Sequence, residues 1–179
     1  MIAAPVVDAA TSSLLRIAGL VEDSIVDGPG LRLTVFAQGC LHNCLGCHNI
    51  HTHSNSGGTL ISIKSIINRI QANPLLDGVT LSGGEPFEQA ESFVVLAKRV
   101  QALGLNVITY TGYTYERLVA GGANRPGWQM LLDQTDYLVD GRFVLEKRNL
   151  MLKYRGSENQ RIIDLNRTRL EKAIIIANL

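Results

Sequence analysis

All three cysteines of this chain lie within one short stretch, and this cluster limits what the chain can be more than any other feature. Cys40, Cys44 and Cys47 follow the spacing C-x3-C-x2-C. Thiolates this close can share one metal centre, because a loop of three or four residues folds back on itself readily. The chain has no fourth cysteine to complete a closed four-thiolate site. A 4Fe–4S cluster held in this way keeps one iron free to bind a small molecule.

The same spacing allows two other interpretations. A zinc site could combine the three thiolates with one imidazole, because every histidine of the chain lies nearby, namely His42, His48, His51 and His53. The cysteines could also be unrelated buried thiols, since free cysteine is among the residue types most often buried. The clustering of all three in one loop argues against unrelated thiols.

A second motif follows a short apolar segment later in the chain. Residues 78–81 predict a buried strand, and Ser82-Gly83-Gly84-Glu85 comes directly after it. Two glycines after a strand let backbone groups approach a ligand closely, and the Glu85 carboxylate could accept hydrogen bonds from an ammonium group. Taken alone, the motif is equally well a glycine turn that opens a helix.

Apolar periodicity predicts that strands and helices alternate along the chain. The expected strands are residues 14–21, 31–38, 78–81, 106–110 and 135–139, and the expected helices are residues 62–71, 89–103, 115–119 and 128–132. This alternation indicates an α/β fold with a parallel sheet. Five or six βα steps are too few to close an eight-stranded barrel, so we expect a partial, open βα barrel of five or six parallel strands. The cysteine loop follows the second strand at its C-terminal end, which carries the chemistry in βα barrels.

Composition places the chain among ordinary globular proteins. With 179 residues, one domain is the natural expectation, and we assign it to residues 14–179 after a flexible extension at residues 1–13. The net charge of +1 favours neither nucleic acid nor an acidic membrane surface as a partner. We expect no membrane-spanning helix and no signal peptide. Three cysteines at metal-binding spacing fit a reducing cytoplasm.

Several motifs together resemble a known enzyme superfamily. The segment V-D-G-P-G-L-R at residues 26–32, the cysteine motif and the later Gly-Gly-Glu are similar to the glycyl-radical-enzyme activating enzymes of the radical S-adenosylmethionine (SAM) superfamily. The segments D-G-R-F at residues 140–143 and R-G-S-E-N-Q at residues 155–160 resemble the activating proteins of anaerobic (class III) ribonucleoside-triphosphate reductases. The resemblance covers about residues 17–165.

The resemblance implies a radical activase with two cofactors. Cys40, Cys44 and Cys47 are expected to bind three irons of one 4Fe–4S cluster, and SAM to chelate the fourth. Reductive cleavage of SAM would give methionine and a 5′-deoxyadenosyl radical, which removes a hydrogen from a glycine Cα of the reductase. No catalytic acid or base is needed. The residues expected to border SAM are Gly46, Cys47, His48, Ser82, Gly83, Gly84, Glu85 and Asp140.

The resemblance also implies partners. These are the glycyl loop of the reductase large subunit and a flavodoxin-like or other low-potential electron donor. Basic residues outnumber acidic ones between residues 142 and 169, which indicates either a solvated face or a docking surface. Three alternatives stay open: an activase of another glycyl radical enzyme such as pyruvate formate-lyase, a radical SAM enzyme that acts on a small molecule, and a zinc-stapled binding module without enzymatic activity.

Overall fold

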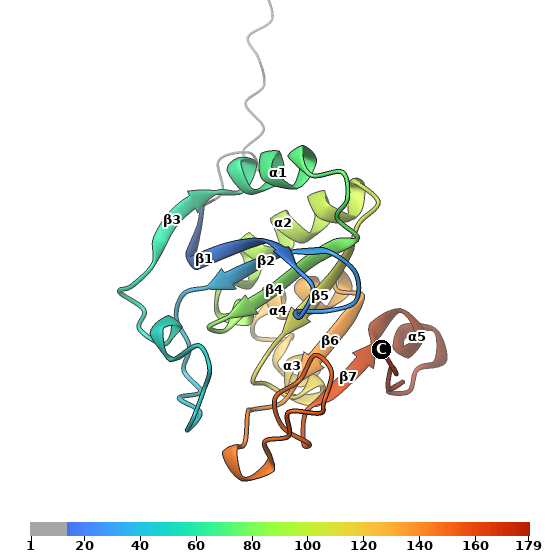
Figure 1. The fold of residues 1–179 in the computed structure, drawn as a ribbon. Coiled ribbons are helices and arrows are strands. Elements are labelled where there is room, and N and C mark those ends of the chain that lie inside the picture. The colour runs from blue at the N-terminus through green and yellow to red at the C-terminus, as the bar shows by residue number, and fades with distance from the viewer. Residues whose placement is uncertain (1–13) are drawn as a thin grey trace, which may run out of the picture.

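A seven-stranded mixed sheet forms the centre of the protein (Figure 1). The computed structural model describes residues 14–179, so the extension expected at residues 1–13 lies outside the described residues. The strands run in the order β3-β1-β2-β4-β5-β6-β7 across the sheet. They are β1 (Leu14–Ser24), β2 (Arg32–Ala37), β3 (Thr59–Ser62), β4 (Gly78–Gly83), β5 (Asn106–Tyr110), β6 (Tyr137–Asp140) and β7 (Arg161–Asp164).

Helices connect most of the strands. The α-helices are α1 (Ile63–Ala72), α2 (Ala90–Ala102), α3 (Tyr115–Gly121), α4 (Pro126–Asp133) and α5 (Leu165–Glu171). The short 3-10 helices are η2 (Ile50–Thr52), η3 (Pro86–Gln89) and η4 (Leu145–Lys147). Within the described part of the chain, none of these helices combines the length and the apolar character that a membrane crossing requires.

The α/β class is confirmed, but the expected number of parallel strands is wrong. Parallel pairing joins β2, β4, β5 and β6, which makes four parallel strands rather than five or six. Strand β1 runs antiparallel to β2 because only a short loop, residues 25–31, joins them, and a parallel pair needs a long crossover. Strands β3 and β7 are also antiparallel to their neighbours and form the two edges of the sheet.

One face of the sheet packs against the helices and holds the main core (Figure 1). Helix α1 shows why the sequence folds in this way. Its four buried isoleucines recur at helical spacing: Ile63, Ile66, Ile67 and Ile70. Burial of each such side chain contributes roughly 1.5–3 kcal/mol. The Ser62 side chain accepts a hydrogen bond from Ser65 N at 3.2 Å and caps the start of the helix.

The opposite face of the sheet is covered by a loop and by the C-terminal residues. Ile108, Val139 and Ile162 form a second, smaller apolar cluster there, and Leu179 packs against it. Over β2 and β4 the cover is the loop at residues 25–31. Thr34 Oγ1 donates to the Asp27 carboxylate at 3.0 Å, and Thr80 Oγ1 donates to the Asp27 carbonyl at 2.9 Å.

The parallel register brings the two sequence motifs together at the C-terminal ends of β2 and β4. Arg32 of β2 lies opposite Gly78 of β4, and Ala37 lies opposite Gly83. The cysteine loop therefore leaves β2 beside the point where Gly84 and Glu85 leave β4. In Figure 1 the turquoise segment after β2 and the orange segment after β6 both extend below this edge.

Candidate functional site

The cysteine loop is closed by its own backbone. Gly39, at φ +98°, turns the chain away from β2, and its N–H donates to Thr52 O at 2.7 Å. The N–H of Cys40 donates to His53 O at 3.0 Å. These two bonds join the ends of the loop, so the three cysteines are held on one short arch directly after the strand. Their expected place at the C-terminal end of a strand is confirmed.

The three cysteines line one cavity together with the glycine motif. This cavity has a volume of about 130 Å³, and its walls include Cys40, Cys44, Cys47, Ser82, Gly83 and Gly84. All three thiols are free and partly buried. The cysteines and the glycines, more than thirty residues apart in sequence, are thus brought to one place by the β2–β4 pairing.

The donor set fits an iron–sulfur cluster. Three thiols around one cavity supply the soft ligands that such clusters take. The imidazole of His42, which stands between the first two cysteines, lies 2.7 Å from a Glu85 oxygen.

The two thiols with perturbed acidity are affected mainly by burial. Burial raises the pKa of Cys40, and hydrogen bonds from the backbone N–H groups of His42 and Asn43 oppose that rise. Burial also raises the pKa of Cys44, and the backbone of Phe143 and the charge of Arg142 act in the opposite direction. The D-G-R-F segment therefore faces the cysteine loop. Bound iron would stabilise the thiolates that burial alone disfavours.

The two glycines of the second motif allow the two strand ends to approach each other. A Cβ on Gly83 would lie 2.6 Å from Phe36 Cα, and a Cβ on Gly84 would lie 2.3 Å from Gly39 O. Gly84 N donates to Ala37 O at 2.8 Å. The sequence predicted that these glycines let backbone groups approach a ligand closely. The structure adds a second reason, because the closest neighbour of each glycine is the backbone that leads into the cysteine loop.

Glu85 lies beneath the cavity and is fully enclosed. Its side chain is 0% exposed, and its carboxylate accepts hydrogen bonds from Thr111 Oγ1 at 3.0 Å, Gly112 N at 2.9 Å and Phe87 N at 3.1 Å. With His42 at 2.7 Å, four groups surround it. Glu85 was expected to accept hydrogen bonds from an ammonium group. In the structure its carboxylate is already surrounded by groups of the protein itself.

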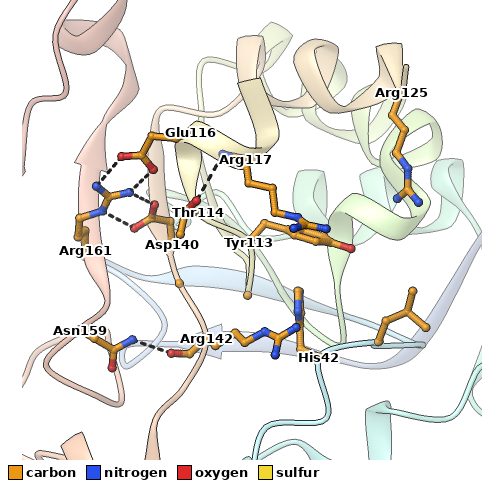
Figure 2. Close-up of a pocket in the computed structure, with 13 residues that line it drawn as sticks. His42, Tyr113, Thr114, Glu116, Arg117, Arg125, Asp140, Arg142, Asn159 and Arg161 are labelled. Atoms are coloured by element: carbon orange, nitrogen blue, oxygen red, sulfur yellow. Dashed lines mark hydrogen bonds and ion pairs between the residues drawn. The ribbon is translucent and has the colours of Figure 1, made fainter. Parts of the chain in front are cut away.

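Asp140 faces a larger neighbouring cavity of about 880 Å³ (Figure 2). Its carboxylate is 1% exposed, pairs with Arg161 through both oxygens, and accepts a hydrogen bond from Tyr115 N at 2.8 Å. Figure 2 shows Arg161 between Asp140 and Glu116. Asp140 thus fixes the start of α3 and the strand β7, while His42, Gly112 and Gly141 line both this cavity and the cysteine cavity.

The two remaining residues of the expected SAM border lie elsewhere on the loop. His48 is exposed, stacks on Phe143 with ring centroids 6.5 Å apart, and lines a third cavity of about 260 Å³. Gly46 is exposed at φ +73°, and a Cβ there would meet Leu145 Cδ1 at 2.9 Å. The structure therefore gathers the cysteines with Ser82–Gly84 and places His48 and Gly46 outside their shared cavity.

The two C-terminal motifs interlock at the edge of the site. Gln160 Oε1 accepts from Gly156 N at 2.9 Å, and Gln160 Nε2 donates to Gly141 O at 3.0 Å. Asn159 Nδ2 donates to Arg142 O at 2.9 Å. The R-G-S-E-N-Q segment is thereby tied to D-G-R-F, which in turn faces Cys44.

Sequence reasoning missed two contributors to this site. Thr111 and Gly112, directly after β5, hold Glu85 and line the cysteine cavity. His42 was considered only as a possible zinc ligand. The one available signal was position, because Thr111 and Gly112 follow a parallel strand at the same sheet edge.

Comparison with known proteins agrees with this geometry. Residues 26–163 match the family model described as a 4Fe-4S single cluster domain. The chain is 36% identical over 144 residues to the anaerobic ribonucleoside-triphosphate reductase-activating protein of Vibrio cholerae, covering 76% of this chain and 89% of that protein. The proteins of the same name from Escherichia coli K12 and phage T4 are 35% and 31% identical, over 76% of this chain and 90% and 86% of theirs.

A solved structure of QueE from Escherichia coli aligns with a TM-score of 0.45 and 17% identity, covering 56% of this chain and 54% of that one. The assignment does not depend on it. The sequence relatives match over most of their own length, and the family model spans the cysteine loop, the glycine motif and both C-terminal motifs. The chain belongs to the family of anaerobic ribonucleoside-triphosphate reductase-activating proteins.

Proposed function

We propose that this protein generates a glycyl radical on the large subunit of the anaerobic ribonucleoside-triphosphate reductase, using one 4Fe–4S cluster and SAM. The observation that carries the proposal is the cavity shared by the three cysteines and the Ser82–Gly84 turn. The names of the full-length relatives support the same activity and partner. We also propose that the open sheet is a partial βα barrel of the radical SAM type, and that residues 14–179 form one domain of a cytoplasmic protein.

Each part of the site has a separate task in this proposal. Cys40, Cys44 and Cys47 would hold the cluster, and Ser82–Gly84 would contact the methionine end of SAM. The bound cofactors would supply the radical chemistry that removes a hydrogen atom from the reductase glycine. Glu85 acts from below by fixing the turns that surround the cavity.

The reductase glycine needs a route to the cysteine cavity. The cavity of about 260 Å³ shares Tyr110 and Phe143 with the cysteine cavity, and Asp27 and His48 also line it. We propose that the glycyl loop of the reductase enters here, next to residues 27–30. Glycine suits this reaction because it has no Cβ to hinder approach to its Cα. A flavodoxin-like or other low-potential protein would deliver the electron.

The test is radical formation in an anaerobic mixture of reconstituted protein, reductant, SAM and the reductase. We expect a glycyl radical signal by electron paramagnetic resonance, and none with Cys44→Ala, which removes a cluster ligand. Pyruvate formate-lyase replaces the reductase in a parallel reaction. A signal with pyruvate formate-lyase and none with the reductase would contradict the proposed partner. Protein that binds zinc but no iron or sulfide would contradict the proposed chemistry.

A further inference from the structure

His42 is buried in a loop whose neighbouring side chains are exposed. It lies between the first two cysteines and is 8% exposed, whereas Leu41 beside it is 59% exposed and Asn43 is also exposed. A buried polar ring is costly unless its nitrogen atoms find partners. The inward position of His42 therefore needs a specific reason.

The partner of His42 is the carboxylate of the glycine motif. His42 Nε2 lies 2.7 Å from Glu85 Oε2, and the Glu85 side chain is fully buried. In the tautomer that carries its proton on Nε2, His42 donates to this carboxylate. The same carboxylate accepts from Thr111 Oγ1 and Gly112 N. One acidic side chain thus connects the cysteine loop, the end of β4 and the turn after β5.

Packing holds the imidazole in this position. The ring lies edge-on to Tyr113, with centroids 4.5 Å apart. A Cβ on Gly112 would lie 2.3 Å from His42 Cδ2, so only glycine at that position leaves room for the ring. The site for His42 is therefore shaped by two residues of the β5 turn as well as by Glu85.

The backbone of His42 contacts a cluster ligand. The backbone N–H groups of His42 and Asn43 lower the pKa of the Cys40 thiol, against the larger opposite effect of burial. Asn43 has φ +48°, the left-handed conformation that turns successive N–H groups toward one acceptor. Hydrogen bonds to cysteine sulfur stabilise the thiolate and influence the reduction potential of iron–sulfur clusters.

We propose that His42 is a positioning residue: through its contact with Glu85 it holds the segment between Cys40 and Cys44 against the ends of β4 and β5, and so fixes the cysteine loop before the cluster binds. Its relevance to the cluster rests on the proposed function. This assignment makes Glu85 a fixed anchor for the loop, and it gives His42 a role in the protein other than binding metal.

Hydrogen–deuterium exchange of the cluster-free full-length chain tests this inference directly. The amides to follow are those of Cys40, His42, Asn43 and Cys47, which all have hydrogen-bond acceptors in the loop. We expect His42→Ala to accelerate their exchange by about tenfold or more, because it removes a buried bond to a charged group. His42→Gln keeps a donor at similar reach and should exchange nearly as slowly as the wild type.

Three further variants keep the outcome interpretable. His51→Ala removes an exposed histidine from the same loop, and Ile66→Ala destabilises the core beneath α1. Neither should accelerate exchange selectively in the cysteine loop. If His42→Ala fails to fold, His42→Asn replaces it, since its shorter amide does not reach Glu85. Unchanged exchange in the variant that removes the contact, or the same selective acceleration in Ile66→Ala, would overturn the inference.

A second measurement uses the reconstituted cluster. We expect the midpoint potential of the cluster to shift in His42→Ala and to return toward the wild-type value in His42→Gln. A general loss of stability, as in Ile66→Ala, should leave the potential unchanged. Equal potentials in all variants would overturn the link to the Cys40 sulfur. If wild-type protein binds no cluster, the proposed function fails, and the exchange experiment still decides the role of His42.

Discussion

Single glycines set the distance between the two strands that carry the motifs. The Gly84 backbone accepts no side chain, because a Cβ would lie within 2.3 Å of Gly39 O and 3.0 Å of Ala37 O. These neighbours are backbone atoms of the segment that leads into the cysteine loop, so they cannot move aside independently. A side chain at this position would shift the cysteine loop itself.

We therefore expect Gly84→Ala to lower the free energy of unfolding by about 1–3 kcal/mol, the usual cost of forcing extra atoms into a packed site. It should also reduce the iron bound after reconstitution. Urea unfolding and iron analysis measure the two effects. Gly19→Ala is the matched control, since a Cβ there meets nothing within 4 Å. Equal stability of the two variants would contradict this account.

At the scale of whole elements, one arginine joins three of them. Arg161 of β7 pairs with Asp140 at the end of β6 and with Glu116 in the first turn of α3, where both guanidinium contacts are 2.9 Å long. The hydrogen bonds from Arg161 lower the pKa of Glu116 to about 2. The same two carboxylates raise the pKa of Arg161 above its ordinary value. Charge pairing thus fastens the edge strand β7 beside the larger cavity.

The lowered pKa of Glu116 makes this contact depend on pH. Its contribution is present above the unfolded-state pKa of about 4.5 and is lost as the pH falls toward the folded-state value of about 2. Because Glu116 is 56% exposed, we expect solvent to limit the contribution to about 0.2–1 kcal/mol.

Urea unfolding of the cluster-free protein between pH 6 and pH 2 measures this difference. We expect Glu116→Gln to be less stable than wild type near pH 6, with the gap closing toward pH 2. Glu146→Gln is the control, because in residues 14–179 that exposed carboxylate has no ion pair. A gap that persists unchanged at pH 2 would argue against the assigned ion pair.

At the scale of the whole molecule, a buried arginine holds the loop-covered face of the sheet together. Arg32 is 0% exposed and donates to Thr80 Oγ1 at 2.7 Å, Val79 O at 2.8 Å and Pro29 O at 3.2 Å. Burial lowers its pKa to about 10, so it stays charged at neutral pH. It connects β2, β4 and the loop at residues 25–31, which borders the proposed entry of the reductase glycine.

Arg32→Met should leave these acceptors buried without a donor and lower the free energy of unfolding by roughly 2–4 kcal/mol. Chemical denaturation measures this change. Arg69→Met is the control, because the pair between Arg69 and Glu22 lies on the surface and contributes about 0–1 kcal/mol. A similar loss of unfolding free energy in both variants would contradict the view that the buried hydrogen bonds of Arg32 stabilise the fold.

Removal of the cluster should leave the fold of the whole molecule intact. The main core contains none of the three cysteines, and they all lie in one loop outside the sheet. A chain of this size buries enough surface to fold without metal, unlike a small zinc module. We expect chelated protein to keep its far-ultraviolet circular dichroism and a cooperative thermal transition. Loss of both on chelation would contradict this expectation.

Local patterns in the sequence were sufficient for most elements. Apolar periodicity predicted a helix at residues 62–71, where α1 lies, and the strand at residues 106–110 was predicted with the bounds of β5. The edge strands β3 and β7 were not predicted. Each has only four residues, and such a short run shows no clear period. The predicted number of parallel strands was too high because the strand at residues 14–21 was counted among them. This strand, β1, is antiparallel to β2, and the direction of a strand depends on its neighbours.

The sequence by itself determined the cysteine loop and the glycine motif, because ligand spacing and turn chemistry depend on residues a few positions apart. Only the tertiary structure decided what the polar residues around them do. His42 meets Glu85 across 43 positions, and Asp140 meets Arg161 across 21. The first pair forms because the parallel strands β2 and β4 end side by side, and the second because β6 and β7 pair antiparallel with Asp140 opposite Arg161. Burial then requires each polar group to find a partner. No local pattern carries that information.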